Sequence, residues 1–219
     1  MGYFVFEGVD GVGKTTVMKE VALELALRGK KFILTKEPGG PKALIEEWQS
    51  LDGLEANIGF QYEGFRPLCV NSPHIPQLVK RALYLADSFY NWEKVILPAL
   101  ADGCIVLSDR SWISDLAYGK ALTGRSFDEL RQFNNALLPA REKATNGIYL
   151  WAHSDIREAR LKRAMADEMD KLGKDKRNEI ADNYVYLFDM FLDINFKMFS
   201  TMQSSKKVGM QVVNWILSQ

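Results

Sequence analysis

The stretch FEGVDGVGKTT, from Phe6 to Thr16, determines how the rest of the chain can be interpreted. Gly8 to Thr15 reads G-V-D-G-V-G-K-T and matches the phosphate-loop pattern G-x-x-x-x-G-K-[ST] at each fixed position. A short apolar run precedes the loop and a helical pattern follows it. In that context backbone N–H groups converge on phosphate oxygens beside a helix N-terminus, so the sequence predicts a nucleoside triphosphate site. The residues expected to contact the nucleotide are Gly8, Val9, Asp10, Gly11, Val12, Gly13, Lys14, Thr15 and Thr16.

Two side chains of this loop have expected roles of their own. Lys14 is expected to contact the β- and γ-phosphates of ATP, and the Thr15 hydroxyl to hold Mg²⁺. The loop alone does not choose a reaction, because switch GTPases, ATP-driven motors and small-molecule kinases share it. The guanine-reading stretch Asn/Thr-Lys-x-Asp does not occur, and 219 residues are few for a motor. These observations favour a small kinase.

Composition narrows the class of protein further. The chain is 47% hydrophobic and 26% charged, which suits one globular domain over 1–219. Its formal net charge of +0 gives no overall attraction to nucleic acid or to a membrane surface. Cys69 and Cys104 are too few for a disulfide framework, and no apolar run reaches the ~18 residues of a membrane span. We therefore expect a cytoplasmic protein with neither a nucleic-acid nor a membrane partner.

Apolar runs of strand length alternate with helical patterns along the chain. Continuous apolar runs are typical of parallel strands that are covered on both faces. The alternation predicts a three-layer α/β fold with a parallel sheet of about five strands. The predicted strands are 3–7, 31–35, 104–108, 147–152 and, more weakly, 196–201, and the predicted helices are 14–28, 77–101, 154–169, 178–194 and 206–217.

The segment 54–77 has no clear period and holds three prolines and two glycines. A long ordered loop or a broken helix is the expected structure. Loops of this length inside a compact domain are uncommon and are often functional.

Beyond the phosphate loop, several motifs follow one another in a characteristic order. They are TKEPGG (35–40), VILPALADGCIVLSDR (95–110), SDLAY (114–118) and IYLWAHSDIREARLKR (148–163). In this order and spacing they resemble the motifs of bacterial-type thymidylate kinases, with TKEPGG similar to the family's TREPGG. The resemblance covers most of the chain except an atypical insertion at about 49–77. It implies a P-loop nucleoside monophosphate kinase that transfers the γ-phosphoryl group of ATP to a deoxynucleoside monophosphate such as dTMP, and that forms a homodimer.

The resemblance also implies roles for residues around the acceptor. Asp10 would accept a hydrogen bond from the 3′-hydroxyl of the acceptor sugar, and Arg110 would bind the acceptor phosphate as a bidentate guanidinium. Asp109 would lie near Mg²⁺ as a carboxylate at the end of its strand. Tyr118 would pack against the sugar, while Glu37 and Pro38 would shape the pocket.

A lid at about 157–180 is the third implication of the resemblance. Family members with Gly after the loop Asp, as Gly11 is here, place their transition-state cations in that lid. Arg160 is the best match for the cation, and Arg163 lies one turn further along the same helix face. The stretch RNE places Arg177 and Glu179 in the Arg-x-Glu position, which makes Glu179 a candidate near Mg²⁺. A solvated helix face is the alternative interpretation of these charges.

The sequence departs from the family pattern where the acceptor base should bind. Tyr84 keeps the aromatic residue of the long helix, but Ser88 replaces the Arg that contacts thymine. Asp115 replaces a small polar residue, Gly119 replaces a Gln, and Trp48 replaces another Arg. Asp115 adds a pure hydrogen-bond acceptor, which suits a base edge rich in N–H groups.

These departures leave the acceptor base open. One hypothesis is a broadened preference that admits dGMP or dUMP beside dTMP. The other is that the insertion supplies replacement contacts through Tyr62, Arg66 or His74. Two other functions also remain open: a non-catalytic nucleotide-binding protein, and a kinase that acts on the deoxynucleoside itself.

Overall fold

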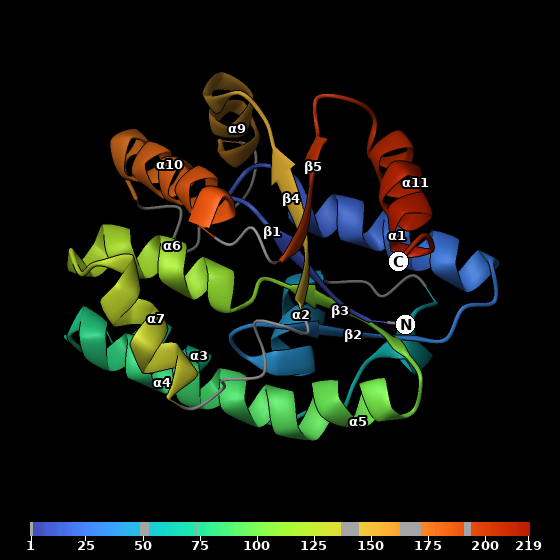
Figure 1. The fold of residues 1–219 in the computed structure, drawn as a ribbon, viewed down its shortest axis with the longest axis horizontal. Coiled ribbons are helices and arrows are strands. Elements are labelled where there is room, and N and C mark those ends of the chain that lie inside the picture. The colour runs from blue at the N-terminus through green and yellow to red at the C-terminus, as the bar shows by residue number, and fades with distance from the viewer. Residues whose placement is uncertain (1, 49–52, 73, 137–144, 163–171, 191–193) are drawn as a thin grey trace.

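A five-stranded parallel sheet runs through the centre of the computed structural model, with helices on both faces (Figure 1). The structure describes residues 2–48, 53–72, 74–136, 145–162, 172–190 and 194–219. The strands lie in the order β2-β3-β1-β4-β5, and every neighbouring pair is parallel. The predicted fold class is therefore confirmed. The strands are β1 (Tyr3–Glu7), β2 (Phe32–Lys36), β3 (Ile105–Asp109), β4 (Thr145–Trp151) and β5 (Asn195–Ser200).

Helices cover the sheet in two layers. On one face lie α1 (Lys14–Leu27) and α11 (Ser205–Ile216), side by side (Figure 1). The other face is covered mainly by α4, α5, α6 and α10. Their bounds, and those of the remaining elements, are α2 (Gly40–Trp48), η1 (Glu55–Asn57), α3 (Arg66–Asn71), α4 (Gln77–Asn91), the π-helical turn η2 (Trp92–Ile96), α5 (Leu97–Ala101), α6 (Trp112–Thr123), α7 (Phe127–Asn135), α9 (Ser154–Leu161) and α10 (Lys174–Met190).

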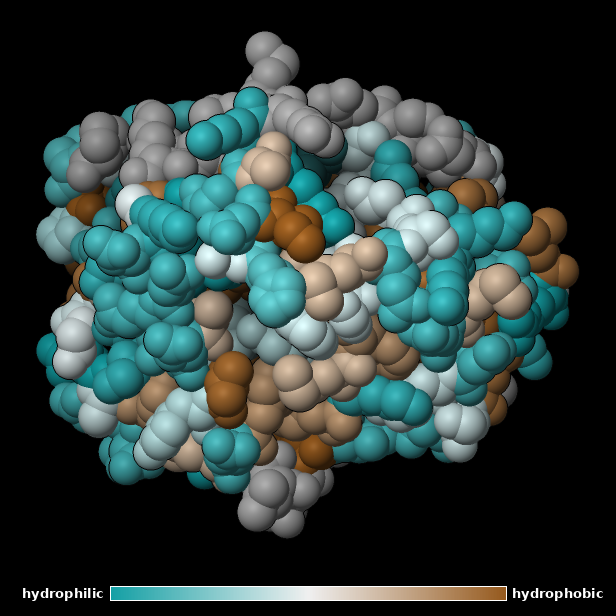
Figure 2. Space-filling model, turned by 90° about the horizontal axis from the view of Figure 1, so that it is seen from above, coloured by the Kyte–Doolittle hydropathy of each residue, from teal (hydrophilic) through white to brown (hydrophobic). Residues whose placement is uncertain are grey.

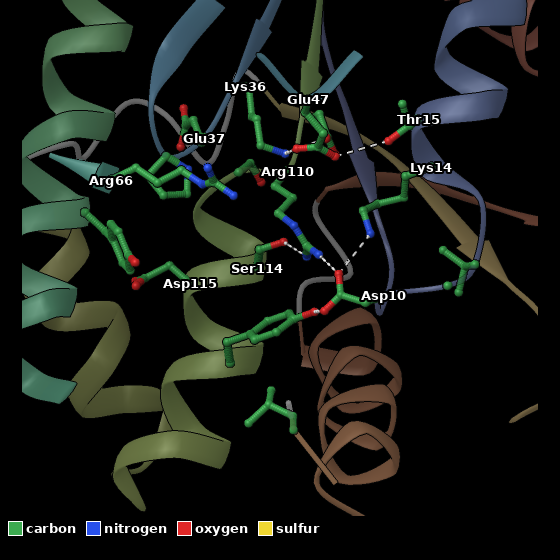
Figure 3. Close-up of a pocket in the computed structure, with 18 of the residues that line it drawn as sticks. Asp10, Lys14, Thr15, Lys36, Glu37, Glu47, Arg66, Arg110, Ser114 and Asp115 are labelled. Atoms are coloured by element: carbon green, nitrogen blue, oxygen red, sulfur yellow. Dashed lines mark hydrogen bonds and ion pairs between the residues drawn. The ribbon is translucent and has the colours of Figure 1, made fainter. Parts of the chain in front are cut away.

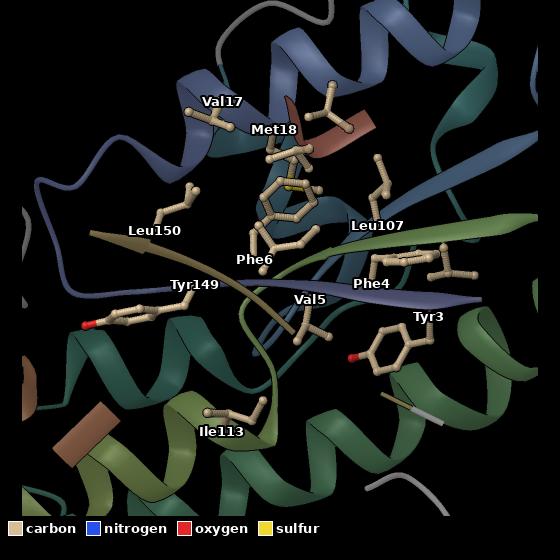
Figure 4. Packing of buried hydrophobic residues seen from close by; sticks show 14 of the residues in the cluster. Tyr3, Phe4, Val5, Phe6, Val17, Met18, Leu107, Ile113, Tyr149 and Leu150 are labelled. Atoms are coloured by element: carbon tan, nitrogen blue, oxygen red, sulfur yellow. The ribbon is translucent and has the colours of Figure 1, made fainter. Parts of the chain in front are cut away.

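Side chains of β1 alternate between the two layers, as the pleat of a strand requires. Phe4 and Phe6 point to the side of α1, whereas Tyr3 and Val5 point to the side of α6 (Figure 4). The Tyr3 ring packs edge-on against Trp92 at 5.7 Å between ring centroids. All five residues of the strand are buried, which explains why YFVFE is apolar up to its last residue.

The register brings the carboxyl ends of β1, β2 and β3 to one edge of the sheet. Phe6 lies opposite Asp109, and Lys36 also lies opposite Asp109. The phosphate loop, the chain after β2 and the chain after β3 therefore leave the sheet beside one another. In open parallel sheets this edge is the usual place for ligands.

The described part of the insertion is an irregular segment interrupted by η1 and α3, in line with the expected ordered loop or broken helix. Ile58 forms an isolated parallel bridge with Leu34, and the Gly59 N–H donates to the Leu34 carbonyl at 3.3 Å. The segment therefore runs along the outer edge of β2 before it forms α3. Two helix boundaries differ from the prediction. The helix α10 begins at Lys174, whereas 178 was predicted. The helix α9 ends at Leu161, whereas 169 was predicted.

None of the helices within the described residues is both long and apolar enough to cross a membrane. Hydrophilic side chains cover most of the face seen in Figure 2, with hydrophobic ones in separate groups among them.

Candidate active site

A cavity of about 1450 Å³ opens at the carboxyl edge of the sheet (Figure 3). It extends from the phosphate loop past Arg110 to α4 and α6. Pockets for one small ligand usually measure ~300–1,000 Å³, so this cavity has room for two nucleotides. Residues predicted for the donor and for the acceptor line the same cavity.

The phosphate loop has a backbone that only glycine can adopt at its tight points. Gly8 has φ 139° and Gly11 has φ 81°, both in the region that side chains disfavour. A Cβ on Gly8 would lie 2.4 Å from the Leu150 carbonyl oxygen, and one on Gly11 would lie 2.7 Å from the Arg157 carbonyl oxygen. The loop is thus wedged between β4 and α9, which fixes where its N–H groups point.

Lys14 lies at the base of the loop with its side chain buried. Its Nζ donates to the Gly8 carbonyl at 3.0 Å and lies 3.8 Å from Asp10 Oδ1. Burial lowers the pKa of Lys14 to about 8, and the nearby Arg110 charge contributes in the same direction. The ammonium is therefore charged at neutral pH but close to titration.

Arg110 is held in the centre of the cavity by several contacts. Its φ of 70° is unusual for a residue with a side chain, and such strain is concentrated at functional sites. The guanidinium pairs with Asp10, donates to Ser114 Oγ at 3.3 Å and stacks over the Tyr118 ring at 5.0 Å. Its position is therefore set by the phosphate loop and by α6 together.

Asp10 also accepts a hydrogen bond from the Tyr118 hydroxyl at 2.9 Å. Burial alone would raise the pKa of Asp10, but the Arg110 and Lys14 charges outweigh it and lower the pKa to about 2. Asp10 is therefore a carboxylate at every pH at which the protein would work. The predicted grouping of Asp10, Arg110 and Tyr118 is what the structure contains.

A buried network that was not predicted from the sequence lies behind Arg110. Glu7 is fully buried and accepts hydrogen bonds from Ser111 at 2.7 Å, Ser114 at 2.5 Å and Tyr184 at 3.0 Å. Burial raises the pKa of Glu7 despite these bonds. The network fixes Ser114, and through it Arg110. The only signal in the sequence was a Glu at the end of an otherwise apolar strand.

A second group links the ends of β2 and β3 to α2. The Lys36 Nζ lies 2.7 Å from Asp109 Oδ2 and 2.7 Å from Glu47 Oε2. The Thr15 hydroxyl donates to Glu47 Oε1 at 3.3 Å, so the group reaches the phosphate loop (Figure 3). Burial opposes both charges, yet their attraction raises the pKa of Lys36 and lowers that of Asp109. Thr15 and Asp109 were predicted as site residues from the sequence, whereas Lys36 and Glu47 were not.

These residues fit a magnesium ion. Asp109 Oδ1 is buried and has no hydrogen-bond partner among the described residues, which leaves a hard oxygen available beside the loop. The described part of the chain holds no cluster of three His, Cys, Asp or Glu side chains of the kind that binds a metal alone. Mg²⁺ typically takes one or two carboxylates and completes its shell with water and nucleotide phosphates. Thr15 and Asp109 suit that partial role.

The predicted lid cations lie in different places. Arg160 lines the cavity, and it donates to the Val12 carbonyl at 2.9 Å and to the Thr201 carbonyl at 2.7 Å. Arg177 instead joins α10 to α9, with its Nε 2.9 Å from Glu158 Oε1. Glu179 is exposed and pairs with Lys176 at 2.6 Å. Neither Arg177 nor Glu179 is among the described residues lining the cavity, and Arg163 lies outside the described residues.

The acceptor half of the cavity contains the other predicted residues. Glu37, Pro38, Tyr84, Ser88 and Asp115 all line it. The Glu37–Pro38 peptide bond is cis, and Glu37 Oε1 accepts a hydrogen bond from the Tyr3 hydroxyl at 3.3 Å.

Of the three insertion residues considered, Arg66 is the one that lines the cavity, and it extends toward Arg110 (Figure 3). Tyr62 packs on Gly40 and donates to the Asp87 carbonyl at 3.3 Å, while His74 is exposed. Trp48 is buried beneath Lys19, whose Nζ lies 5.3 Å from its ring. Replacement contacts from the insertion can thus come from Arg66.

Comparison with known proteins places the chain among related sequences. The family model described as "Thymidylate kinase" matches residues 69–212. The chain is 32% identical over 215 residues to "Probable thymidylate kinase" of Pyrococcus abyssi, which covers 97% of this chain and 94% of that protein. It is 28% identical over 219 residues to "Thymidylate kinase" of Lactobacillus acidophilus, covering 97% and 92%. A match to "Thymidylate kinase" of Geotalea daltonii is 36% identical over 149 residues, covering 68% of this chain but only 59% of that protein.

Proposed function

The chain belongs to the thymidylate kinase family, and from this premise we propose that it transfers the γ-phosphoryl group of ATP to dTMP, giving ADP and dTDP. The observation that carries the proposal is the shared cavity. Arg110 lies between the phosphate loop and the pocket formed by α4 and α6, where it can contact an acceptor phosphate that faces a donor on the loop.

The reaction needs positioning and charge neutralisation rather than covalent help from the protein. An oxygen of the dTMP phosphate forms a bond to the γ-phosphorus while the bond to the β,γ-bridging oxygen breaks, and ADP leaves. Lys14 and the loop N–H groups would hold the donor phosphates. Arg110 would hold the acceptor phosphate, and Asp10, as a carboxylate, would accept a hydrogen bond from the sugar 3′-hydroxyl.

Magnesium supplies positive charge to the donor phosphates when it is bound. Thr15 and Asp109 would hold it, and Lys36 and Glu47 would fix the Asp109 carboxylate. Arg160 already lies over the loop carbonyls, so the start of the lid is anchored to the donor side. Closure of the remaining lid over 157–180 would exclude water from the transferring group. Arg163 and Arg177 are proposed as further lid cations and Glu179 as a carboxylate near Mg²⁺, as the resemblance to the family implies.

A coupled assay of ADP release tests the proposed reaction. ADP formation with dTMP, and little with thymidine or without acceptor, is expected. Release with thymidine but not with dTMP would instead indicate a nucleoside kinase. ADP at background with thymidine and all five acceptors (dTMP, dUMP, dGMP, dCMP and dAMP) would indicate a non-catalytic nucleotide-binding protein.

We further propose that the whole chain acts as one kinase domain, in the cytoplasm where both nucleotides occur, and as a homodimer. The support for a dimer is the set of exposed apolar side chains on α4 and α5: Leu78, Val79, Phe89, Tyr90 and Leu97. A mass of about twice 24.9 kDa is expected by light scattering. Phe89→Glu should lower it, and a wild-type mass of one chain at micromolar concentration would exclude this dimer.

A further inference from the structure

The acceptor end of the cavity contains a buried ion pair between α4 and α6. Arg81 Nη2 lies 2.7 Å from Asp115 Oδ2, and both residues line the cavity. The Arg81 side chain is 5% exposed and that of Asp115 is 20% exposed. Arg81 is therefore enclosed by protein, while Asp115 remains accessible to a ligand.

Other contacts fix Arg81 in this place. The same Nη2 donates to the Leu130 carbonyl at 3.1 Å and to Asn134 Oδ1 at 2.8 Å. The guanidinium also lies over the Phe133 ring at 5.3 Å. Three protein acceptors share the two hydrogens of Nη2, and Arg81 Nε is buried with no hydrogen-bond partner among the described residues. Because its side chain is 5% exposed and that of Asp115 is 20% exposed, Arg81 is assigned as a positioning residue and Asp115 as the group that a ligand in the cavity can contact.

Gly119 makes room for this arrangement. A Cβ at Gly119 would lie 3.2 Å from Arg81 Nε, closer than most real contacts of this kind. Arg81, Asp115 and Gly119 are therefore one structural unit, which explains why Asp115 and Gly119 both depart from the family pattern. Their common effect is to hold a charged carboxylate at a fixed orientation in the acceptor pocket.

The position of Asp115 relates it to the acceptor base. Tyr118, one helical turn further along α6, binds Asp10 at the loop, whereas Asp115 lies toward α4 (Figure 3). A monophosphate with its phosphate at Arg110 and its sugar at Tyr118 would direct its base to Tyr84, Ser88 and Asp115. This geometry rests on the proposed function, because it assumes a nucleoside monophosphate acceptor.

We propose that Asp115, positioned by Arg81, selects acceptor bases by the ring N–H on their pairing edge. A carboxylate only accepts hydrogen bonds, so it pairs with the N3–H of thymine or uracil or the N1–H of guanine. Cytosine and adenine present a lone pair at that ring nitrogen, which a carboxylate repels. Truncating one partner of a hydrogen bond to a charged group weakens binding about 10- to 100-fold.

The test compares dTMP with 5-methyl-dCMP, which keeps the methyl group and changes only the 4-substituent and the ring N–H. The ratio of kcat/KM for the two acceptors is expected to fall about 10-fold or more in Asp115→Asn, because an amide can turn its NH₂ toward the lone pair. Arg81→Met should lower the ratio mainly through KM for dTMP, and Arg81→Lys should restore part of it. Arg125→Met removes an exposed ion pair with Glu129 outside the cavity and should leave the ratio unchanged.

Two outcomes separate this inference from the proposed function. A wild-type protein without dTMP-dependent ADP release would overturn the function itself. An active wild type whose ratio is unchanged in Asp115→Asn and in Arg81→Met would overturn only the role of the pair. If Arg81→Met does not fold, Gly119→Ala places a Cβ 3.2 Å from Arg81 Nε and so displaces the guanidinium, and its ratio must fall for the proposal to stand.

Discussion

At the level of single residues, burial in the cavity shifts the pKa of the phosphate-loop lysine, Lys14. Lys14 lies in a crowded cationic region, and burial together with Arg110 lowers its pKa to about 8. Asp10 and Asp109 oppose that shift but do not cancel it. The phosphate loop therefore carries an ammonium that is charged at pH 7 and neutral at high pH until a phosphate binds.

This makes ATP binding sensitive to alkaline pH. As pH rises through about 8, the free protein loses the Lys14 charge, whereas bound phosphates favour the charged form. The dissociation constant for ATP, measured by isothermal titration, is expected to rise above pH 8, with proton uptake on binding.

Lys14→Arg is the matched control, because its guanidinium keeps its charge over this range. Its affinity for ATP should be lower at pH 7 but should not decline further toward pH 9. An affinity of the wild type that is constant from pH 7 to 9.5 would contradict the assigned role of Lys14.

At the level of elements, the insertion supplies a cation to the acceptor half of the site. Arg66 begins α3, and its side chain packs on Gly39, with its Cδ 3.5 Å from where a Cβ of that glycine would lie. Trp48, the position where the family pattern has an Arg, is buried under Lys19 instead. Arg66 of the insertion, and not residue 48 of α2, therefore brings a guanidinium to the cavity in this chain.

Arg66→Ala is expected to raise KM for dTMP with little change in KM for ATP. Loss of a charge-assisted hydrogen bond costs about 1.5–3 kcal/mol, or about 10- to 100-fold in kcat/KM for dTMP. Glu63→Ala is the control from the same insertion, because Glu63 is exposed and pairs with Lys42. Equal increases in KM for dTMP in Arg66→Ala and Glu63→Ala would show that the insertion affects activity only through the stability of the fold.

Some helices were predictable from the sequence and others were not, for physical reasons. The long pattern over 77–101 is amphipathic and was identified. The helix α6 is buried on most sides, so it has no polar face to reveal its period. By contrast, α7 begins with a capping box between Ser126 and Glu129 that the sequence analysis could have used.

Some residues of the site could likewise be predicted from the sequence, and others could not. Asp109 and Arg110 could be assigned because the ends of parallel strands meet at one edge of the sheet. Arg81 and Glu47 could not, because they lie on helices whose rotation relative to the sheet is not fixed by local sequence. The pairing of Asp115 with Arg81 therefore could be found only in the three-dimensional structure.

At the level of the whole molecule, a single cavity joins elements from both halves of the chain. The loop after β1, the turn after β2 and Arg110 after β3 provide the phosphate side, while α4 and α6 provide the base side. Arg160, from α9, anchors the start of the lid to the loop. The arrangement predicts that donor and acceptor bind together and react directly, without a phosphorylated protein.

The most direct measurement is to identify the product formed from γ-³²P-labelled ATP and unlabelled dTMP. Direct transfer within the shared cavity predicts labelled dTDP, no label on the protein, and about a 100-fold or greater loss of labelled dTDP in Arg110→Ala, with ATP binding retained. Failure to form labelled dTDP, or an Arg110→Ala protein as active as the wild type, would contradict it.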